Sequence, residues 1–324
     1  MMEPLFLKPV FQEKIWGGQK LAQDFHYKLP NTKIGECWAI SAHPHGPSQV
    51  ENGPYAGKYL HELWQDYPEL FGNPQGQVFP LLTKILDAEA SLSVQVHPDN
   101  AYAQEHEGEL GKTECWYIIS AEPDSYLIYG HNAQNKQQMI DMIENGDWEH
   151  FLKKLPVHAG DFIFVPSGTV HALNKGIVAL ETQQSSDTTY RLYDYNRVDA
   201  KTGKKRQLHL RQSEETITVP FVAPQLDIKT QKLGPNTITS YVQPPLSPYF
   251  AVWGINIHTG HLSFTHQLGK YTLYSVIKGS GTLEVDNRHY SLPLGSHFII
   301  PAPITAWQIS GENLQLIASE STEK

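Results

Sequence analysis

The sequence contains very little cysteine and no long apolar run. Its 324 residues include only two cysteines, Cys37 and Cys115, which excludes a small secreted fold held together by several disulfides. No apolar stretch is long enough to cross a bilayer, and the first residues lack the basic, apolar and small-residue regions of a signal peptide. We therefore expect two free thiols, no membrane partner and a cytoplasmic location.

An excess of positive charge is also lacking. The chain has 25 Lys and Arg against 34 Asp and Glu, which gives a formal net charge of −9. This balance argues against nucleic acid as a partner, although a small anion can still bind in a local basic pocket. The one basic stretch, Lys201–Arg206, is interpreted as a solvated turn, with the border of an entrance for an anionic substrate as the alternative.

Short strand-like runs are the main feature that the sequence does contain. They are rich in Val, Ile, Tyr and Phe and are bounded by Gly, Pro and Asp, which indicates a mainly β fold. The runs cover residues 35–41, 79–86, 91–97, 114–120, 126–130, 161–166 and 177–182. Helical patterns interrupt them at about 58–69, 100–107 and 136–155.

An internal repeat predicts two similar β domains. Gly160–Pro166 and Gly295–Pro301 each consist of a glycine, an apolar strand and a closing proline. Five residues after each proline, the first copy has His171 and the second has Ala306. We therefore expect a metal-binding domain at 1–225, with helical insertions at about 58–69 and 136–155, and a metal-free domain at 226–324.

Four side chains in the first copy have the chemistry of a metal site. Gln95 and His97 are two residues apart in a strand-like run, so both point to the same face. Glu114 and His171 belong to other strand-like segments. If the four converge, they form a mixed nitrogen and oxygen site with room for a substrate oxygen.

The motifs around these residues resemble known families. The pattern Gly160-x5-Pro166-x-Gly168-x2-His171 is similar to the second signature of the cupin superfamily, and Gln95-Val96-His97 with Glu114 resembles the first. A closer resemblance is to the short bacterial form of the type I mannose-6-phosphate isomerases. It rests on six motifs spread in order along almost the whole chain: Trp16–Gly18, Gly35–Trp38, Leu82–Ala88, Ser91–Asp99, Gly111–Glu114 and Tyr190–Tyr195.

The resemblance implies a fold, a reaction and a cofactor. It implies two cupin (jelly-roll) β-barrel domains and an enzyme that interconverts D-mannose 6-phosphate and D-fructose 6-phosphate through a metal-stabilised enediol. It also implies one Zn²⁺ per chain, bound at the positions of Gln95, His97, Glu114 and His171. Gln95 is the weakest of these ligands, and ligand type alone leaves Mn²⁺, Co²⁺ and Fe²⁺ open.

Two further positions are expected to be catalytic and two to bind the substrate. Arg191 matches the arginine regarded as catalytic in the family, and it could stabilise developing negative charge or grip the phosphate. Lys112, two residues before Glu114, is expected beside the metal as a base whose pKa the zinc charge lowers. Lys84 and Trp16 are expected in the substrate pocket, with a solvent-facing lysine and core packing as their alternatives.

Other activities remain open at this stage. A cupin-type phosphoglucose isomerase is one alternative, and a sugar-binding bicupin without catalysis is another. The expected partner is a hexose 6-phosphate, and the chain is expected to be a monomer or a homodimer. Fold resemblance alone does not separate these activities, because cupins carry out many chemistries.

Overall fold

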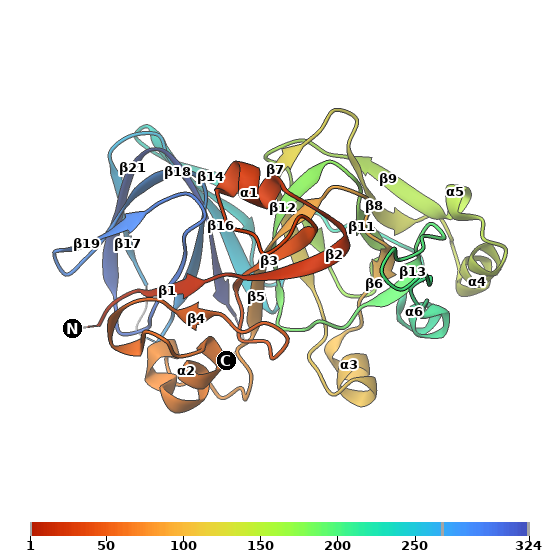
Figure 1. Ribbon diagram of the computed structural model, residues 1–324, viewed down its shortest axis with the longest axis horizontal. Helices are drawn as coiled ribbons and strands as arrows, with labels where there is room; N and C mark the ends of the chain where they lie inside the picture. The colour runs from red at the N-terminus through yellow and green to blue at the C-terminus, as the bar shows by residue number, and fades with distance from the viewer. Residues whose placement is uncertain (1, 267–268, 323–324) are drawn as a thin grey trace.

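The protein is mainly β, with two β regions lying side by side and helices placed around them (Figure 1). The computed structural model describes residues 2–266 and 269–322. Its strands form sheets of ten, six and five strands. None of the helices in these described ranges has the length and apolar character that crossing a membrane requires.

The six-stranded and five-stranded sheets carry the sequence motifs of the first repeat. The six-stranded sheet has the order β10-β7-β12-β5-β2-β3. These strands are β10 (Phe162–Val165), β7 (Glu114–Ala121), β12 (Ile177–Gln184), β5 (Leu81–Ala88), β2 (Val10–Gly18) and β3 (Ile34–Ile40). The five-stranded sheet contains β13 (Tyr190–Tyr193), β6 (Val94–Val96), β11 (His171–Leu173), β8 (Tyr126–His131) and β9 (Leu152–Pro156), in that order.

The ten-stranded sheet contains the second repeat and two strands from the start of the chain. Its main path runs through β14 (Lys229–Leu233), β15 (Asn236–Val242), β16 (Phe250–Ile257), β21 (Ala306–Ser321), β18 (Thr272–Val285), β20 (His297–Ile300), β1 (Leu5–Lys8) and β4 (Gln49–Val50). Strand β17 (His261–Thr265) pairs with β21, and β19 (Arg288–Leu292) pairs with β18. Because β1 pairs with β20, the N-terminal segment is built into this sheet. The expected domain boundary at residues 225 and 226 remains a prediction.

Strand register brings three of the predicted site residues into one row. In the five-stranded sheet, Gln95 of β6 pairs with His171 of β11 on one side and with Arg191 of β13 on the other. Glu114 of β7 belongs to the six-stranded sheet, where it pairs with Val165 and Gln183. The site therefore lies between two sheets that the chain visits alternately.

One large apolar core joins the two β regions. It includes residues of β3 and β5 together with residues of β16 and β18. Phe162 of β10 stacks on Tyr241 of β15 with ring centroids 4.6 Å apart, and Phe164 lies edge-on to Phe250. Each large side chain buried in this way stabilises the fold by roughly 1.5–3 kcal/mol. The second β region therefore supports the sheet that carries Glu114.

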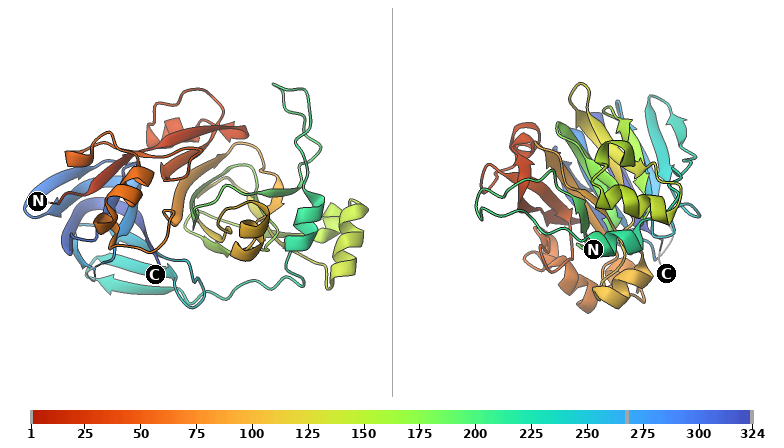
Figure 2. Two further views of the ribbon diagram at one scale, coloured as in Figure 1. Left: turned by 90° about the horizontal axis from the view of Figure 1, so that it is seen from below. Right: turned by 90° about the vertical axis from the view of Figure 1, so that its right-hand side faces the viewer.

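The helices lie mostly around the first β region, with α4 and α5 at its far end (Figures 1 and 2). Their bounds are α1 (Lys20–Phe25), α2 (Leu60–Asp66), α3 (Asn100–His106), α4 (Lys136–Glu144), α5 (Trp148–Phe151) and α6 (Leu210–Thr216). Two short 3₁₀ helices cover Gly53–Tyr55 and Pro68–Phe71. The helices predicted at about 58–69 and 100–107 are confirmed, and the second starts after Asp99, whose side chain accepts a hydrogen bond from the Tyr102 amide.

The single long helix predicted at 136–155 is wrong beyond Glu144. Helix α4 ends there, and Gly146 has a φ of 66°, a left-handed conformation that interrupts the helix. After the short helix α5, Leu152 begins strand β9, which pairs with β8. The apolar side chains of Trp148, Phe151 and Leu152 therefore pack in one cluster, although the first two belong to a helix and the third to a strand.

Both cysteines are free thiols, as expected. Cys37 in β3 and Cys115 in β7 are buried, and no disulfide joins them. Cys115 packs in the apolar core on the opposite face of β7 from Glu114. Neither thiol is therefore placed to bind a metal together with Glu114.

Replacing Gly17 with alanine is expected to destabilise the protein. A Cβ atom at Gly17 would lie 2.3 Å from the Gly35 amide nitrogen and 2.5 Å from the Ile34 carbonyl carbon. Backbone atoms cannot yield as a flexible side chain does, so we expect a loss of about 1–3 kcal/mol, measured as a lower Tm. Gly76→Ala is the control, because its nearest neighbour would be the Val78 oxygen at 3.7 Å. Equal Tm values for the two variants would contradict this account of the β2–β3 contact.

Candidate active site

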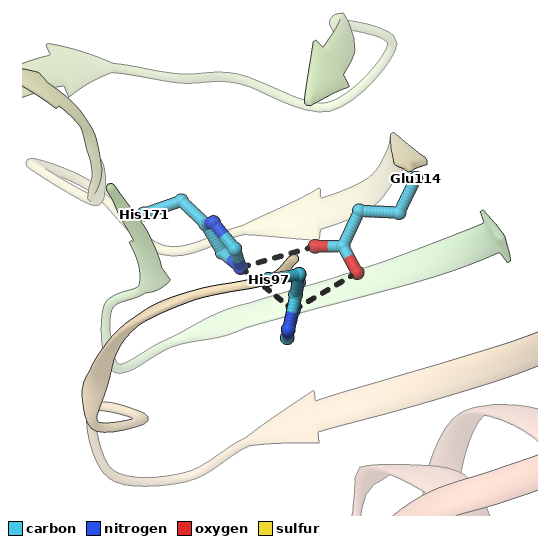
Figure 3. A group of neighbouring side chains, drawn as sticks. All are labelled: His97, Glu114 and His171. Atoms are coloured by element: carbon cyan, nitrogen blue, oxygen red, sulfur yellow. Dashed lines mark hydrogen bonds and ion pairs between the residues drawn. The ribbon is translucent and has the colours of Figure 1, made fainter. Parts of the chain in front are cut away.

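Three of the predicted residues form a compact buried group (Figure 3). His97 follows β6, Glu114 begins β7 and His171 begins β11. His97 Nε2 lies 3.4 Å from Glu114 Oε2, His171 Nε2 lies 3.2 Å from Glu114 Oε1, and the two Nε2 atoms are 3.1 Å apart. The side chains come from both sheets of the first β region, so the folded structure is needed to assemble them.

Backbone carbonyls fix the orientation of both imidazoles. His97 Nδ1 lies 2.9 Å from the Thr188 oxygen, and His171 Nδ1 lies 2.8 Å from the Thr169 oxygen. A carbonyl oxygen can only accept, so each Nδ1 carries the proton and each Nε2 presents a lone pair. The two lone pairs therefore face each other and the Glu114 carboxylate, an arrangement that favours a cation between them.

The surroundings hold these groups in the protonation states that bind metals. Burial, together with the nearby Lys112 charge, lowers the pKa of His97 to about 3. Burial also lowers the pKa of His171. Burial opposes ionisation of Glu114, but the adjacent Lys112 charge outweighs burial and places the pKa of Glu114 well below its usual range. Neutral imidazoles and an ionised carboxylate are the forms that coordinate divalent ions.

The group passes a geometric test for a bound divalent metal. Nitrogen and oxygen ligands around a tetrahedral zinc ion lie about 3.3 Å from one another, since each is roughly 2.0–2.1 Å from the ion. The observed separations of 3.1–3.4 Å agree with that value. Both Glu114 oxygens are buried and make no well-aligned hydrogen bond with the described residues, although the Lys112 ammonium lies 3.1 Å from Oε2. His97, Glu114 and His171 can therefore hold a metal ion.

Gln95 lies at the edge of this group. Its side-chain nitrogen is 3.4 Å from His171 Nε2, and the residue is half-buried. Rotation of the amide would turn the oxygen toward the same point. Gln95 also lines a neighbouring cavity. It is thus placed between the three buried groups and the space that a substrate would enter.

This neighbouring cavity has a volume of ≈ 280 Å³ and contains every remaining residue predicted for the site. Trp16, Lys84, Lys112 and Arg191 all line it. Five of its lining residues are cationic and three are acidic: Lys14, Lys84, Lys112, Arg191 and Arg206 against Glu36, Glu181 and Asp187. A chain with a net charge of −9 therefore has a locally positive cavity, which favours an anionic ligand.

Lys112 connects the cavity to the three buried groups. Its Nζ lies 3.1 Å from both Glu114 Oε2 and His97 Nε2, as expected from its position two residues before Glu114. Burial opposes the charge of Lys112, but the carboxylates of Glu114, Glu181 and Asp187 outweigh burial and raise its pKa. In this environment Lys112 carries a proton and is a hydrogen-bond donor.

Arg191 and Arg206 place two guanidinium groups in the cavity wall. Arg191 donates from Nε to Ser93 Oγ at 3.3 Å and from Nη1 to the Gln207 oxygen at 2.9 Å. Burial and the Arg206 charge lower the pKa of Arg191 to about 10, so it stays charged near neutral pH. Arg206 donates two hydrogen bonds to Asp194, at 2.9 and 2.6 Å. A bound anion would stabilise two like charges held in one wall.

Arg206 is a site residue that the sequence did not reveal by itself. It ends the basic stretch Lys201–Arg206, for which a solvated turn was the favoured interpretation. That interpretation fits Lys201, which is largely exposed and pairs with Glu13 of β2. The alternative, a contribution to an anion entrance, fits Arg206. The signal was the basic run, but only the fold shows which of its residues reaches the cavity.

Lys84 and Trp16 are both buried. Lys84 has a side-chain exposure of 3%, with Nζ 3.6 Å from Glu181, 3.8 Å from Glu36 and 4.9 Å from the centre of the Trp38 ring. The alternative of a solvent-facing lysine is therefore wrong. Trp16 packs in an apolar cluster and also borders the cavity, and its role in binding substrate remains a prediction.

Glu109 is a second residue that sequence reasoning missed. Its Oε2 accepts hydrogen bonds from Ser186 Oγ at 3.1 Å, from Thr188 Oγ1 at 3.0 Å and from the Asp187 amide at 3.3 Å. These donors belong to three successive residues, Ser186 to Thr188. The backbone carbonyl of Thr188 is also the group that orients His97. Glu109 thus holds residues 186–188 in place, and through the Thr188 carbonyl it keeps the His97 imidazole in one orientation.

The comparisons with known proteins agree with this fold and site. Residues 5–122 match the family described as phosphomannose isomerase type I, catalytic domain, and residues 237–321 match the mannose-6-phosphate isomerase, cupin domain. A mannose-6-phosphate isomerase from Streptococcus mutans is 51% identical over 325 residues, which is 100% of each chain. The mannose-6-phosphate isomerase ManA from Bacillus subtilis is 49% identical and covers 95% of this chain and 96% of its own.

Solved structures extend the comparison to three dimensions. A crystal structure of a mannose 6-phosphate isomerase from Bacillus subtilis has a TM-score of 0.93 and 48% identity, and it covers 98% of this chain and 99% of its own. A variant of phosphomannose isomerase from Salmonella typhimurium has a TM-score of 0.78 at 15% identity, covering 99% and 100%, which shows a shared fold. Fold and site together define a mainly β protein with a cupin domain and a candidate metal centre. The chain belongs to the type I phosphomannose isomerase family.

Proposed function

We propose that this protein interconverts D-mannose 6-phosphate and D-fructose 6-phosphate with the help of one zinc ion per chain. The observation that carries the proposal is the group of neutral His97, ionised Glu114 and neutral His171 beside a cavity with a positive balance of charge. Family membership supplies the reaction class. The positive balance of charge and the cavity volume of ≈ 280 Å³ suit a hexose phosphate substrate.

His97, Glu114 and His171 would hold the zinc ion, with the Gln95 amide as the fourth ligand. A zinc ion at this position supplies Lewis-acid chemistry for the oxygens of a neighbouring substrate. The described residues favour zinc because imidazole and carboxylate ligands at these separations suit a tetrahedral site. Gln95 lines the cavity, so substrate would meet the metal on that side.

Arg191 and Arg206 would bind the phosphate group. A guanidinium group stays charged and donates from a planar fork that matches phosphate oxygens. Ser93 and the Gln207 carbonyl already fix Arg191, while Asp194 fixes Arg206, so little side-chain entropy is lost when an anion binds. This assignment favours the phosphate role of Arg191 over direct stabilisation of the reacting atoms.

Lys112 would serve as the proton-transferring group near the metal. The reaction moves a proton between two adjacent carbons, so one group close to both can accept and return it. Lys112 is the cavity lysine whose Nζ lies 3.1 Å from Glu114 and His97. To accept a proton it needs a lower pKa, which a divalent positive charge at those same ligands would provide. Lys84, held by Glu36 and Glu181, would add positive charge to the wall of the same cavity.

The finer features of the fold and setting are part of the same proposal. We propose that residues 1–225 and 226–324 form two cupin jelly-roll barrels, supported by the family match at 237–321 and by the repeated strand pattern. We also propose a cytoplasmic location, supported by two free thiols. A monomer or a homodimer remains the expectation for the oligomeric state.

Metal depletion tests the proposed reaction. Protein stripped of metal by a chelator is expected to be inactive in a coupled assay from mannose 6-phosphate to fructose 6-phosphate and to regain activity with Zn²⁺. Glucose 6-phosphate, assayed in parallel, is expected to be turned over far more slowly. If the metal-loaded enzyme instead isomerises glucose 6-phosphate and leaves mannose 6-phosphate unchanged, the phosphoglucose isomerase alternative is correct. No turnover of either substrate would favour the sugar-binding alternative.

Two substitutions are expected to separate metal binding from substrate binding. His97→Ala removes a metal ligand, so bound zinc should be lost, as measured by elemental analysis. Arg191→Ala leaves the three buried groups intact, so zinc should be retained while KM rises about tenfold or more, because a charge-assisted contact with the phosphate is lost. His297→Ala is the matched control for the first variant, because His297 is equally buried at 1% exposure but lies in β20. Loss of zinc from Arg191→Ala would overturn this division of roles.

Glu109→Gln is expected to weaken zinc binding without touching a ligand. Neutralising Glu109 frees the segment from Ser186 to Thr188, so the Thr188 carbonyl no longer holds His97 in one orientation. Loss of such an outer partner typically costs about 10–100-fold in metal affinity, measurable by competition with a chelator of known affinity. Glu105→Gln on the exposed side of α3 makes the same charge change and should leave the affinity unchanged. Equal zinc affinities in both variants would refute the orienting role of Glu109.

A further inference from the structure

A second cavity lies in the C-terminal β region, far along the chain from the residues assigned above. It has a volume of ≈ 180 Å³ and is lined by β15, β16, β17, β18 and β21. Its walls carry four aromatic side chains, Trp253, Phe264, Tyr274 and Trp307. The rings are arranged as a corner: Phe264 lies nearly parallel to Trp307, and Tyr274 is close to perpendicular to both.

Strand register shows that this cavity is the counterpart of the proposed zinc site in the second repeat. In the first copy, Val165, the residue before Pro166, pairs with Glu114. In the second copy, Ile300, the residue before Pro301, pairs with Thr272. Thr272 therefore occupies the position of Glu114, as Ala306 occupies that of His171. Two residues further along these strands, Tyr274 takes the place of Trp116, which lies beside His171.

The metal-binding chemistry at this position has been replaced by a different set of groups. Thr272 lines the cavity and donates a hydrogen bond from Oγ1 to Glu320 Oε1 at 2.6 Å. Glu320 is the one charged residue among the described residues of the lining. The Trp307 side chain is buried, with an exposure of 5%, and its Nε1–H interacts with Tyr274 but makes no well-aligned hydrogen bond in the described ranges. The cavity thus offers a carboxylate, aromatic faces and an indole N–H donor.

The lining of this cavity favours a cationic ligand that also carries an oxygen acceptor. Aromatic faces attract cations, and they do so most strongly where water is excluded. Among the described lining residues there is no Lys or Arg to oppose a cation. The nearby His266 lies edge-on to Trp307 and 3.5 Å from Thr272, and burial lowers its pKa, so it is uncharged at neutral pH. The indole N–H would be satisfied by an oxygen on the ligand.

We propose that this cavity is a binding site for a small organic ammonium ion that carries a hydroxyl group. The ammonium group would lie against the aromatic corner and Glu320, and the hydroxyl oxygen would accept from Trp307 Nε1. The site is separate from the proposed zinc centre, and the proposal does not depend on the isomerase reaction. It assigns a ligand-binding role to the repeat that has lost its histidine.

Choline is a suitable probe, and its neutral analogue 3,3-dimethylbutan-1-ol has the same shape without the charge. Using the full-length protein, we expect saturable choline binding in ligand-observed NMR and calorimetry, and at least tenfold weaker binding of the neutral alcohol. Glu320→Gln should weaken choline binding at least tenfold while preserving side-chain shape. Trp307→Phe should weaken it while retaining an aromatic face.

The control measurements keep the proposal open to refutation. Isomerase turnover and zinc content should be unchanged in Glu320→Gln, because Glu320 lies outside the zinc site and its cavity. Circular dichroism and Tm should show that the variant is folded. The absence of saturable choline binding to the wild-type protein, or equal affinity for choline and its neutral analogue, would overturn the proposal. Unchanged choline affinity in folded Glu320→Gln would overturn the role of the carboxylate.

Discussion

The orientation of two buried imidazoles is the constraint on which the rest of the site depends. His97 and His171 each give their Nδ1 proton to a backbone carbonyl, so both Nε2 lone pairs point toward Glu114. Burying these groups without a shared cation would be costly, because lone pairs and a carboxylate face one another in a region shielded from water. The carbonyls belong to loops that Glu109 and the backbone hydrogen bond from Gly168 to His97 hold in place. These hydrogen bonds therefore keep the imidazole rings of His97 and His171 from rotating.

The distribution of charge explains how an acidic chain can take an acidic substrate. The excess of carboxylates is spread over the whole sequence, whereas five cationic side chains line one cavity of ≈ 280 Å³. Several of these cations are held by acids that line the cavity or lie behind its wall: Lys84 by Glu36 and Glu181, and Arg206 by Asp194. Such pairing orients the cations and limits their mutual repulsion, and it leaves a positive balance for a phosphate dianion.

The two repeats illustrate how one strand arrangement can carry different chemistry. Paired strands set Glu114 against Val165 in the first copy and Thr272 against Ile300 in the second. With the carboxylate and the histidine replaced by Thr272 and Ala306, the second copy cannot build the same group of ligands. Aromatic side chains fill the corresponding space and leave a smaller cavity with one carboxylate. The shared core between the two β regions shows that the second copy also supports the first.

The sequence alone was sufficient to predict seven strands of the first β region, the repeated strand motif, the grouping of His97, Glu114 and His171, and the face on which Lys112 lies. These predictions rest on local rules: the two-residue alternation of a strand and the spacing of motifs are set by neighbours along the chain. Arg206 and Glu109 could not be found in this way, nor could strand β9 in a segment predicted to be helical. Their roles depend on which loops meet after the sheets pack, and Leu152 became a strand residue because β8 offered a free edge. Local alternation determined where side chains point, and tertiary packing decided which of them meet.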